Sequence, residues 1–165
     1  MAQIVPISET HVTSFRMCID AVAKERRFLA QIEALPLESV QGFVAQSVAS
    51  DAVQFVAIER EQVIGWADIF PAWAHAVTHC GTLGMGVLLE YRGQGIGKRL
   101  LQTCISKAHS KGITRIELEA RADNARAIAL YEHLGFKHEA RKRHAMRFDG
   151  VYYDAVQMSL LQAEI

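Results

Sequence analysis

A glycine-rich turn between an apolar run and an amphipathic pattern constrains this chain more than any other feature. Gly93, Gly95 and Gly97 stand at the start of the predicted helix and leave its first backbone N–H groups without a capping side chain. With the positive end of the helix dipole, these groups form a site for a phosphate or pyrophosphate. Lys98 and Arg99 oppose the dipole unless an anion lies between them. The apolar residues of the predicted helix share one face: Ile96, Leu100, Leu101, Cys104, Ile105 and Ala108.

Two familiar phosphate-binding motifs do not fit this turn. A dinucleotide-binding fingerprint needs G-x-G-x-x-G, and counting from Gly93 its third glycine falls at Lys98. A P-loop needs G-x-x-x-x-G-K followed by Ser or Thr. Counting back from Gly97, its first glycine position holds Arg92, and Arg99 replaces the hydroxyl that would bind magnesium. The turn is therefore an anion site of another kind.

Two motifs carry a resemblance to a known family. Residues 92–97 (RGQGIG) match the pattern Gln/Arg-x-x-Gly-x-Gly/Ala, and residues 123–136 (DNARAIALYEHLGF) match N-x-x-A-x-x-x-Y-x-x-x-G-F. In this order, with one helix and one strand between them, they resemble the two signatures of the GNAT acetyltransferase superfamily. The resemblance covers roughly residues 80–160 closely and the rest only in its order of elements.

The resemblance implies an α/β GNAT fold and acetyl-CoA as the acyl donor. The fold has a mixed, partly splayed central sheet flanked by helices, with the cofactor between two strands. Backbone groups of residues 85–87 would pair with the pantetheine arm, and one N–H would polarise the thioester carbonyl. The N–H groups from Gly93 to Lys98 would hold the pyrophosphate. The predicted cofactor-binding residues are Met85, Gly86, Val87, Arg92, Gly93, Gln94, Gly95, Ile96, Gly97, Lys98, Asn124, Ala127 and Tyr131.

Tyr131 is the predicted general acid. A phenol with an ordinary pKa of about 10 holds its proton at neutral pH and can give it to the departing thiolate. Ala127 lies four residues earlier on the same helical face, where its methyl group lets the cofactor approach closely. Asn124, one turn earlier still, can hydrogen-bond the pantetheine amides. Without the motif, Tyr131 would be interpreted as a core residue at a helix–sheet contact.

Glu119 is the predicted catalytic base. It ends a predicted strand, on the opposite face from Leu118. Its spacing from Tyr131 resembles that in ribosomal-protein alanine N-acetyltransferases, where a glutamate so placed draws the proton of the amine through water. A carboxylate with a pKa near 4.3 is a poor base for an ammonium with a pKa of about 10 unless burial raises it. Two alternatives therefore stay open: water is the base and Glu119 only holds the ammonium, or Glu119 belongs to a solvated strand face.

The predicted function is direct acetyl transfer from acetyl-CoA to a primary amine, on a small molecule or a peptide N-terminus. The alternative is a non-catalytic acyl-CoA-binding or sensing module, which would need no acid at Tyr131. A homodimer formed through the late hairpin is compatible with both hypotheses. Residues 75–80 hold two histidines and a cysteine, but their spacing matches no usual zinc ligand pattern, so no metal is predicted.

Length and composition set the outer bounds. The 165 residues predict one domain, and half of them are hydrophobic, enough for one core. Eighteen basic and eighteen acidic residues cancel, which argues against a nucleic-acid binder. No membrane span or basic, apolar leader is evident. Three cysteines far apart in the sequence indicate reduced thiols and a cytoplasmic protein.

The hydrophobic pattern predicts alternating strands and helices that build one mixed sheet. Asp149-Gly150 is a strong hairpin signal. The predicted strands cover residues 2–7, 53–60, 62–70, 81–89, 113–119, 136–148 and 151–160. The predicted helices follow residue 8 and cover residues 36–49, 95–111 and 124–134.

Overall fold

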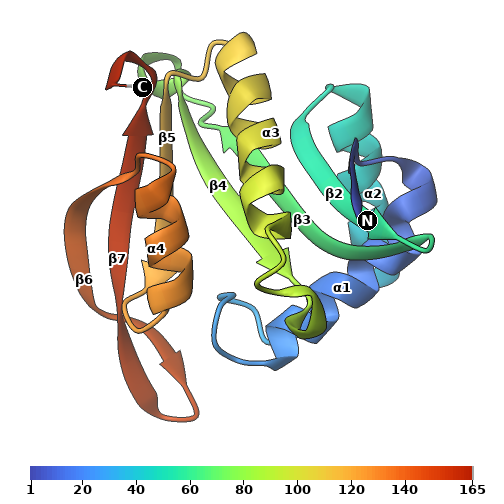
Figure 1. Ribbon diagram of the computed structural model, residues 1–165, viewed down its shortest axis with the longest axis horizontal. Helices are drawn as coiled ribbons and strands as arrows, with labels where there is room; N and C mark the ends of the chain where they lie inside the picture. The colour runs from blue at the N-terminus through green and yellow to red at the C-terminus, as the bar shows by residue number, and fades with distance from the viewer. Residues whose placement is uncertain (165) are drawn as a thin grey trace.

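The computed structural model describes residues 1–164, in which seven strands form one sheet in the order β1-β2-β3-β4-β5-β7-β6 (Figure 1). The strands are β1 Gln3–Pro6, β2 Val53–Glu59, β3 Gln62–Pro71, β4 Cys80–Val87, β5 Arg115–Arg121, β6 Lys137–Phe148 and β7 Val151–Leu161. The helices are α1 Val12–Lys24, α2 Leu37–Ala49, α3 Ile96–Ser110 and α4 Ala125–His133. Neighbouring strands are antiparallel except β4 and β5, which are parallel.

The sheet opens between β4 and β5. Their register consists of three pairs at the start of both strands: Cys80↔Arg115, Gly81↔Ile116 and Thr82↔Glu117. Beyond these pairs the two strands run on to Val87 and Arg121 without pairing to each other in the described part of the chain, and Figure 1 shows them diverging. The mixed, partly splayed sheet predicted from the sequence is confirmed.

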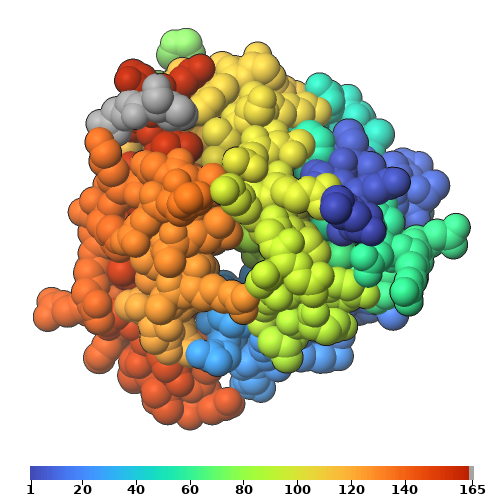
Figure 2. All heavy atoms as spheres, viewed as in Figure 1, coloured from blue at the N-terminus to red at the C-terminus, as the bar shows by residue number. Residues whose placement is uncertain are grey.

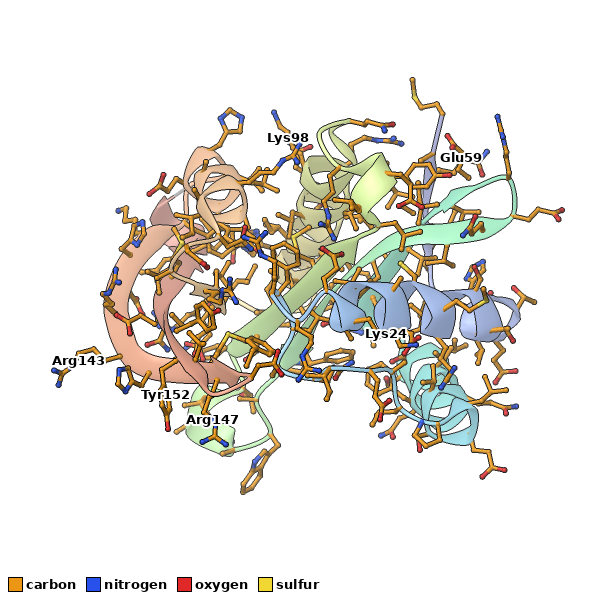
Figure 3. All side chains as sticks on the ribbon, turned by 90° about the horizontal axis from the view of Figure 1, so that it is seen from below. Lys24, Glu59, Lys98, Arg143, Arg147 and Tyr152 are labelled. Carbon is orange, nitrogen blue, oxygen red and sulfur yellow. The ribbon has the colours of Figure 1, made fainter. Side chains whose placement is uncertain are left out.

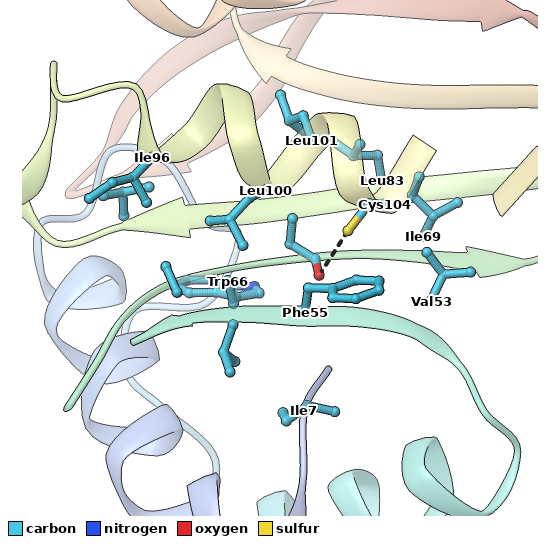
Figure 4. Close-up of a cluster of buried hydrophobic side chains, with 14 of the residues drawn as sticks. Ile7, Val53, Phe55, Trp66, Ile69, Leu83, Ile96, Leu100, Leu101 and Cys104 are labelled. Atoms are coloured by element: carbon cyan, nitrogen blue, oxygen red, sulfur yellow. Dashed lines mark hydrogen bonds between the residues drawn. The ribbon is translucent and has the colours of Figure 1, made fainter. Parts of the chain in front are cut away.

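Helices cover both faces of this sheet. Figure 3 shows α3 and α4 on one side and α1 and α2 on the other. Alternate residues of β3 face the two layers. The Ala67 carbonyl accepts a hydrogen bond from the Cys104 thiol of α3 at 3.3 Å. The Trp66 ring instead packs edge-on against Phe15 of α1, with 6.0 Å between the ring centroids. Figure 4 shows the side chains of α3 packed against β2 and β3.

Element boundaries follow the sequence pattern to within one residue except at the end of β4, which stops at Val87 rather than at residue 89, and at β5. The sequence predicts this strand over residues 113–119, but it covers Arg115–Arg121. The start moves because the Ile113 N–H bonds back to the Ala108 carbonyl at the end of α3. The end moves because residues 120 and 121 pair with β7, a contact between distant parts of the chain. Glu119 therefore lies inside β5 rather than at its end. No helix within residues 1–164 is both long and apolar enough to cross a bilayer.

Side chains of β3 lean over the two glycines of β4 that precede Val87. A Cβ atom built on Gly86 would lie 2.3 Å from Cη2 of the Trp66 ring. One on Gly84 would lie 3.0 Å from Oδ1 of Asp68. Glycines in a strand often mark close approach of another group, and here Trp66 and Asp68 are the groups that approach on this face.

We expect Gly86→Ala to lower the free energy of unfolding by about 1–3 kcal/mol, since the rigid Trp66 ring is itself packed against Phe15 and must move. Urea denaturation measures the effect. Gly42→Ala in α2 is the matched control, because its Cβ meets no atom within 4 Å and removing a helical glycine stabilises by roughly 0.5–1 kcal/mol. Equal stability of the Gly86→Ala variant and the wild type would contradict the close contact.

Candidate active site

The turn that leads into α3 has the backbone of an anion site. Gly93 and Gly95 have φ of +79° and +78°, a left-handed conformation that strongly favours glycine. Gly95 is the N-cap of α3 and supplies no capping side chain. The first N–H groups of α3 therefore lie uncapped at the positive end of the helix dipole, as the sequence predicts.

Arg126 adds a positive charge that the sequence argument did not assign. A Cβ atom built on Gly93 would lie 2.4 Å from Nη2 of Arg126, so the guanidinium of α4 rests on the glycine turn. Lys98, in the first turn of α3, also reaches α4, with its Nζ 3.1 Å from Nε2 of His133. Two cations from separate helices thus lie near the uncapped amides. Arg126 stands between two motif positions, Asn124 and Ala127, and only the packing of α4 against α3 reveals its place.

Arg92 ties the turn to the chain that follows α1. Its guanidinium donates to both carboxylate oxygens of Glu25, at 2.9 and 2.5 Å, and its Nε donates to the Val87 carbonyl at 2.8 Å. It also lies 4.8 Å from the centroid of the Phe28 ring. These contacts hold the turn in place, and the direct cofactor contact assigned to Arg92 stays a prediction. Gln94 likewise bonds locally, to the Glu90 carbonyl at 3.1 Å.

The second motif positions three residues on α4. Asn124 caps the helix, since its Oδ1 accepts the Ala127 N–H at 3.3 Å and leaves the amide NH₂ to donate elsewhere. Tyr131 is buried, and its ring lies 5.8 Å from that of Phe136. This burial raises the pKa of Tyr131 to about 12. The phenol therefore keeps its proton throughout the neutral range.

Glu119 lies on the face of β5 opposite the buried Leu118 and Ala120. It is exposed, and Lys142 of β6 donates to both of its oxygens, at 2.8 and 3.0 Å. This pair was not predicted from the sequence. The predicted base thus already has a cationic partner, as a residue on a solvated strand face would, and its role as base or ammonium-binding group stays a prediction.

The segment between α1 and α2 borders the gap between β4 and β5 and contacts both the turn into α3 and the β6–β7 hairpin. Arg26 of this segment bonds to Asp149 at the tip of the β6–β7 hairpin, with 2.9 Å between Nη2 and Oδ1, while its neighbour Glu25 holds Arg92. Figure 2 shows an opening between α4 and the turn into α3, with this segment at its lower edge. In Figure 3 Lys24, at the end of α1, and Tyr152, on the hairpin, lie on the same side of the sheet.

The loop before β4 has the features of an ordinary polar loop. His79 is exposed, and its Nε2 lies 3.5 Å from the Cys80 sulfur. Across residues 1–164, no group of three His, Cys, Asp or Glu side chains is placed to hold a metal ion.

Comparisons with known proteins agree with this geometry. Residues 19–136 match the family model of the acetyltransferase (GNAT) family. The ribosomal protein bS18-alanine N-acetyltransferase of Escherichia coli K12 is 39% identical over 71 residues, which cover 43% of this chain and 48% of that protein. A GNAT acetyltransferase structure from Streptococcus pneumoniae superposes with a TM-score of 0.91 at 23% identity, covering 98% of this chain and 99% of that one. The Salmonella typhimurium protein yncA, solved with its cofactor acetyl-CoA, superposes with a TM-score of 0.91 at 17% identity, covering 99% of this chain and 95% of that one.

An open mixed sheet, with an uncapped glycine turn where two parallel strands separate, is the arrangement that the sequence resemblance implies. The match covers well over half of the chain, so this protein belongs to the acetyltransferase (GNAT) family. The resemblance drawn from the two sequence motifs is thereby confirmed. The sequence match spans about half the length of the curated relative.

Proposed function

We propose that this protein is an N-acetyltransferase that moves the acetyl group of acetyl-CoA directly to a primary amine. One observation carries the proposal: the uncapped N-terminus of α3 stands where β4 and β5 separate. A diphosphate on those amides puts the pantetheine arm into the gap, where the free edge of β4 can pair with it over residues 85–87. Lys98 and Arg126 stabilise the diphosphate charge.

The reaction proceeds in a ternary complex. The amine nitrogen attacks the thioester carbonyl carbon, a backbone N–H of β4 stabilises the developing oxyanion, and the C–S bond breaks. Tyr131 donates to the departing thiolate, and Glu119 binds the acceptor ammonium on the opposite side of the sheet from α4. Neither Cys18 nor Cys104 is a nucleophile, because both are buried and burial raises the pKa of each thiol to about 12.

The acceptor is a small-molecule amine or a peptide N-terminus. The name of the Escherichia coli relative, an alanine N-acetyltransferase acting on a ribosomal protein, supports the peptide class. The segment between α1 and α2 and the late hairpin, joined by the Arg26–Asp149 contact, would wall the acceptor site. A cytoplasmic location and a homodimer belong to the same proposal, and sedimentation of the purified protein tests the second.

An amine panel with detection of free coenzyme A thiol tests the function. The panel holds peptides with N-terminal alanine, polyamines and amino-acid analogues, each with saturating acetyl-CoA. We expect thiol release that depends on one class of amine, and mass spectrometry should find that amine 42 Da heavier, roughly the mass of an added acetyl group. Saturable coenzyme A binding without turnover on any amine would instead indicate a sensing module.

A further inference from the structure

Asp68 is an acidic residue in the middle of an otherwise apolar stretch of β3. It pairs with Gly84 of β4, and its carboxylate leans over that glycine, where a Cβ atom would lie 3.0 Å from Oδ1. Any larger residue at position 84 would crowd this carboxylate. Gly84 belongs to the part of β4 that no longer pairs with β5. The carboxylate therefore lies next to the gap in which the thioester is proposed to lie.

The surroundings of Asp68 do not balance its charge. Its neighbour on β2 is Gln54, which is 1% exposed and whose side-chain oxygen and nitrogen both lack a hydrogen-bond partner among residues 1–164. No Lys, Arg or His of the described chain acts on the Asp68 carboxylate. Buried polar groups are usually paired, so an unpartnered amide beside an unpaired carboxylate indicates a site prepared for a polar group from outside the chain.

Burial raises the pKa of Asp68 to about 7, and a hydrogen bond from the Gly84 backbone offsets only part of this. The titratable group on α3 that interacts with it is the Cys104 thiol. On α1 the Cys18 thiol is the titratable group among the buried residues, and burial keeps both thiols neutral. The residues that α2 buries are Val40, Val44 and Ser47, none of which titrates in this range.

Asp68 and Glu119 are two carboxylates on the same face of the sheet, on either side of the gap. The register Thr82↔Glu117 places Glu117 on the face of Gly84, and Glu119 follows two residues later on that face. Their environments differ, since Glu119 is exposed and paired with Lys142 whereas Asp68 has no cationic partner in the described chain. Such a contrast between neighbouring acids often separates a charge-holding role from a proton-transfer role.

We propose that Asp68 is the general base of the acetyl transfer, taking the proton of the acceptor ammonium directly or through one water molecule. The proposal rests on the proposed function above and names its substrate class, an amine that arrives as a cation. An N–H bond of the ammonium breaks and its proton passes to Asp68. The freed electron pair forms the N–C bond, and the C–S bond breaks while Tyr131 donates a hydrogen bond to the departing thiolate. The nitrogen releases its second proton as the amide forms, and the thiolate takes up this proton and leaves as the free thiol. Asp68 then returns its proton to water.

The raised basicity matters for the rate. Proton transfer from an ammonium with a pKa of about 10 to an ordinary carboxylate is unfavourable by about six orders of magnitude in its equilibrium constant. With Asp68 this disadvantage falls to about three orders of magnitude. Just above neutral pH, the Asp68 carboxylate is then ionised while the acceptor amine is still a charged ammonium ion.

Asp68→Asn tests the base role, because it keeps the shape and removes the carboxylate. We expect kcat to fall at least about 100-fold while the Kd for acetyl-CoA stays within about twofold. The wild-type kcat/KM should rise with pH through about 7, and the variant should lack this rise. Asp51→Asn makes the same chemical change at a turn where Asp51 pairs with Lys107, and its kinetics should match the wild type.

The possible outcomes separate the two proposals. Wild-type kcat in Asp68→Asn, with only a higher KM for the amine, would overturn the base role and leave the acetyltransferase proposal intact. A wild-type protein that binds acetyl-CoA but acetylates no amine would overturn both. Carbon NMR of selectively labelled aspartate carboxyls does not depend on turnover: the signal lost in Asp68→Asn should titrate near pH 7, and titration below pH 5 would contradict the proposal.

Stability gives an independent check on the same group. The native pKa of Asp68 is raised, so the native state holds a proton that the unfolded chain releases as the pH rises from about 4 to about 7. The stability of the wild type should therefore fall across this range through Asp68, a fall that Asp68→Asn lacks. We expect the variant to have the higher Tm at pH 8 and a similar Tm at pH 4. A lower Tm of the variant at pH 8 would contradict a costly buried charge.

Discussion

Replacing Tyr131 by Phe is expected to lower kcat by about 10²- to 10⁴-fold while the Kd for acetyl-CoA stays within about twofold. The ring remains, so its contact with Phe136 and its place in the core are kept. What is lost is the hydroxyl that donates to the departing sulfur. Stopped-flow thiol detection and calorimetric titration of acetyl-CoA measure the two quantities separately.

The high pKa of Tyr131 shapes this prediction. A value of about 12 keeps the phenol protonated, but it also makes the phenol a weaker acid than an alkyl thiol, whose pKa is about 8.5. Tyr131 therefore acts by donating a hydrogen bond as negative charge builds on sulfur. We expect no decline of kcat from Tyr131 ionisation below about pH 10. Tyr91→Phe removes a hydroxyl from a half-buried tyrosine outside the predicted site and is the matched control. Equal kcat for Tyr131→Phe and wild type would remove the acid role.

Gly95→Glu is expected to weaken acetyl-CoA binding by at least about 100-fold, because it places a carboxylate where the diphosphate would lie and repels it. A Cβ atom at Gly95 meets no protein atom within 4 Å, so the new side chain can be accommodated without a steric clash in the fold. The positive φ of +78° adds backbone strain, which a control must reproduce.

Gly112→Glu provides that control at the other end of α3. Gly112 has a φ of +84° and also has open space around it, so the variant carries the same charge and similar strain far from the turn. Its acetyl-CoA affinity should stay within about twofold of the wild type. Similar losses in both variants would mean that strain, and not an occupied anion site, explains the effect.

Local features were predictable because their causes lie within a few residues. Asp149-Gly150 forms the hairpin turn, with φ of +50° and +81°, since these residue types tolerate the left-handed conformation. The glycine turn and the helix after it follow from the same local preferences. The splay of the sheet came from the family resemblance and not from local pattern, because it depends on which strands are neighbours.

Parts of the candidate site could not be read from the sequence because distant segments form them. Glu25 reaches Arg92 across 67 positions and Lys142 reaches Glu119 across 23, and no local pattern encodes either pair. Arg126 lies on Gly93 only because α4 packs beside α3. Asp68 did leave a signal, since a charged residue in a buried strand is unusual and calls for a partner. Its meaning needed Gln54 and Gly84 from the neighbouring strands.

A crystal structure with coenzyme A tests the central claim most directly. The account predicts diphosphate oxygens within about 3 Å of the backbone N–H groups between Gly93 and Lys98, with the pantetheine arm between β4 and β5. It also predicts that the sulfur points toward the Tyr131 hydroxyl. Coenzyme A bound away from this turn, or no binding at millimolar concentration, would contradict it.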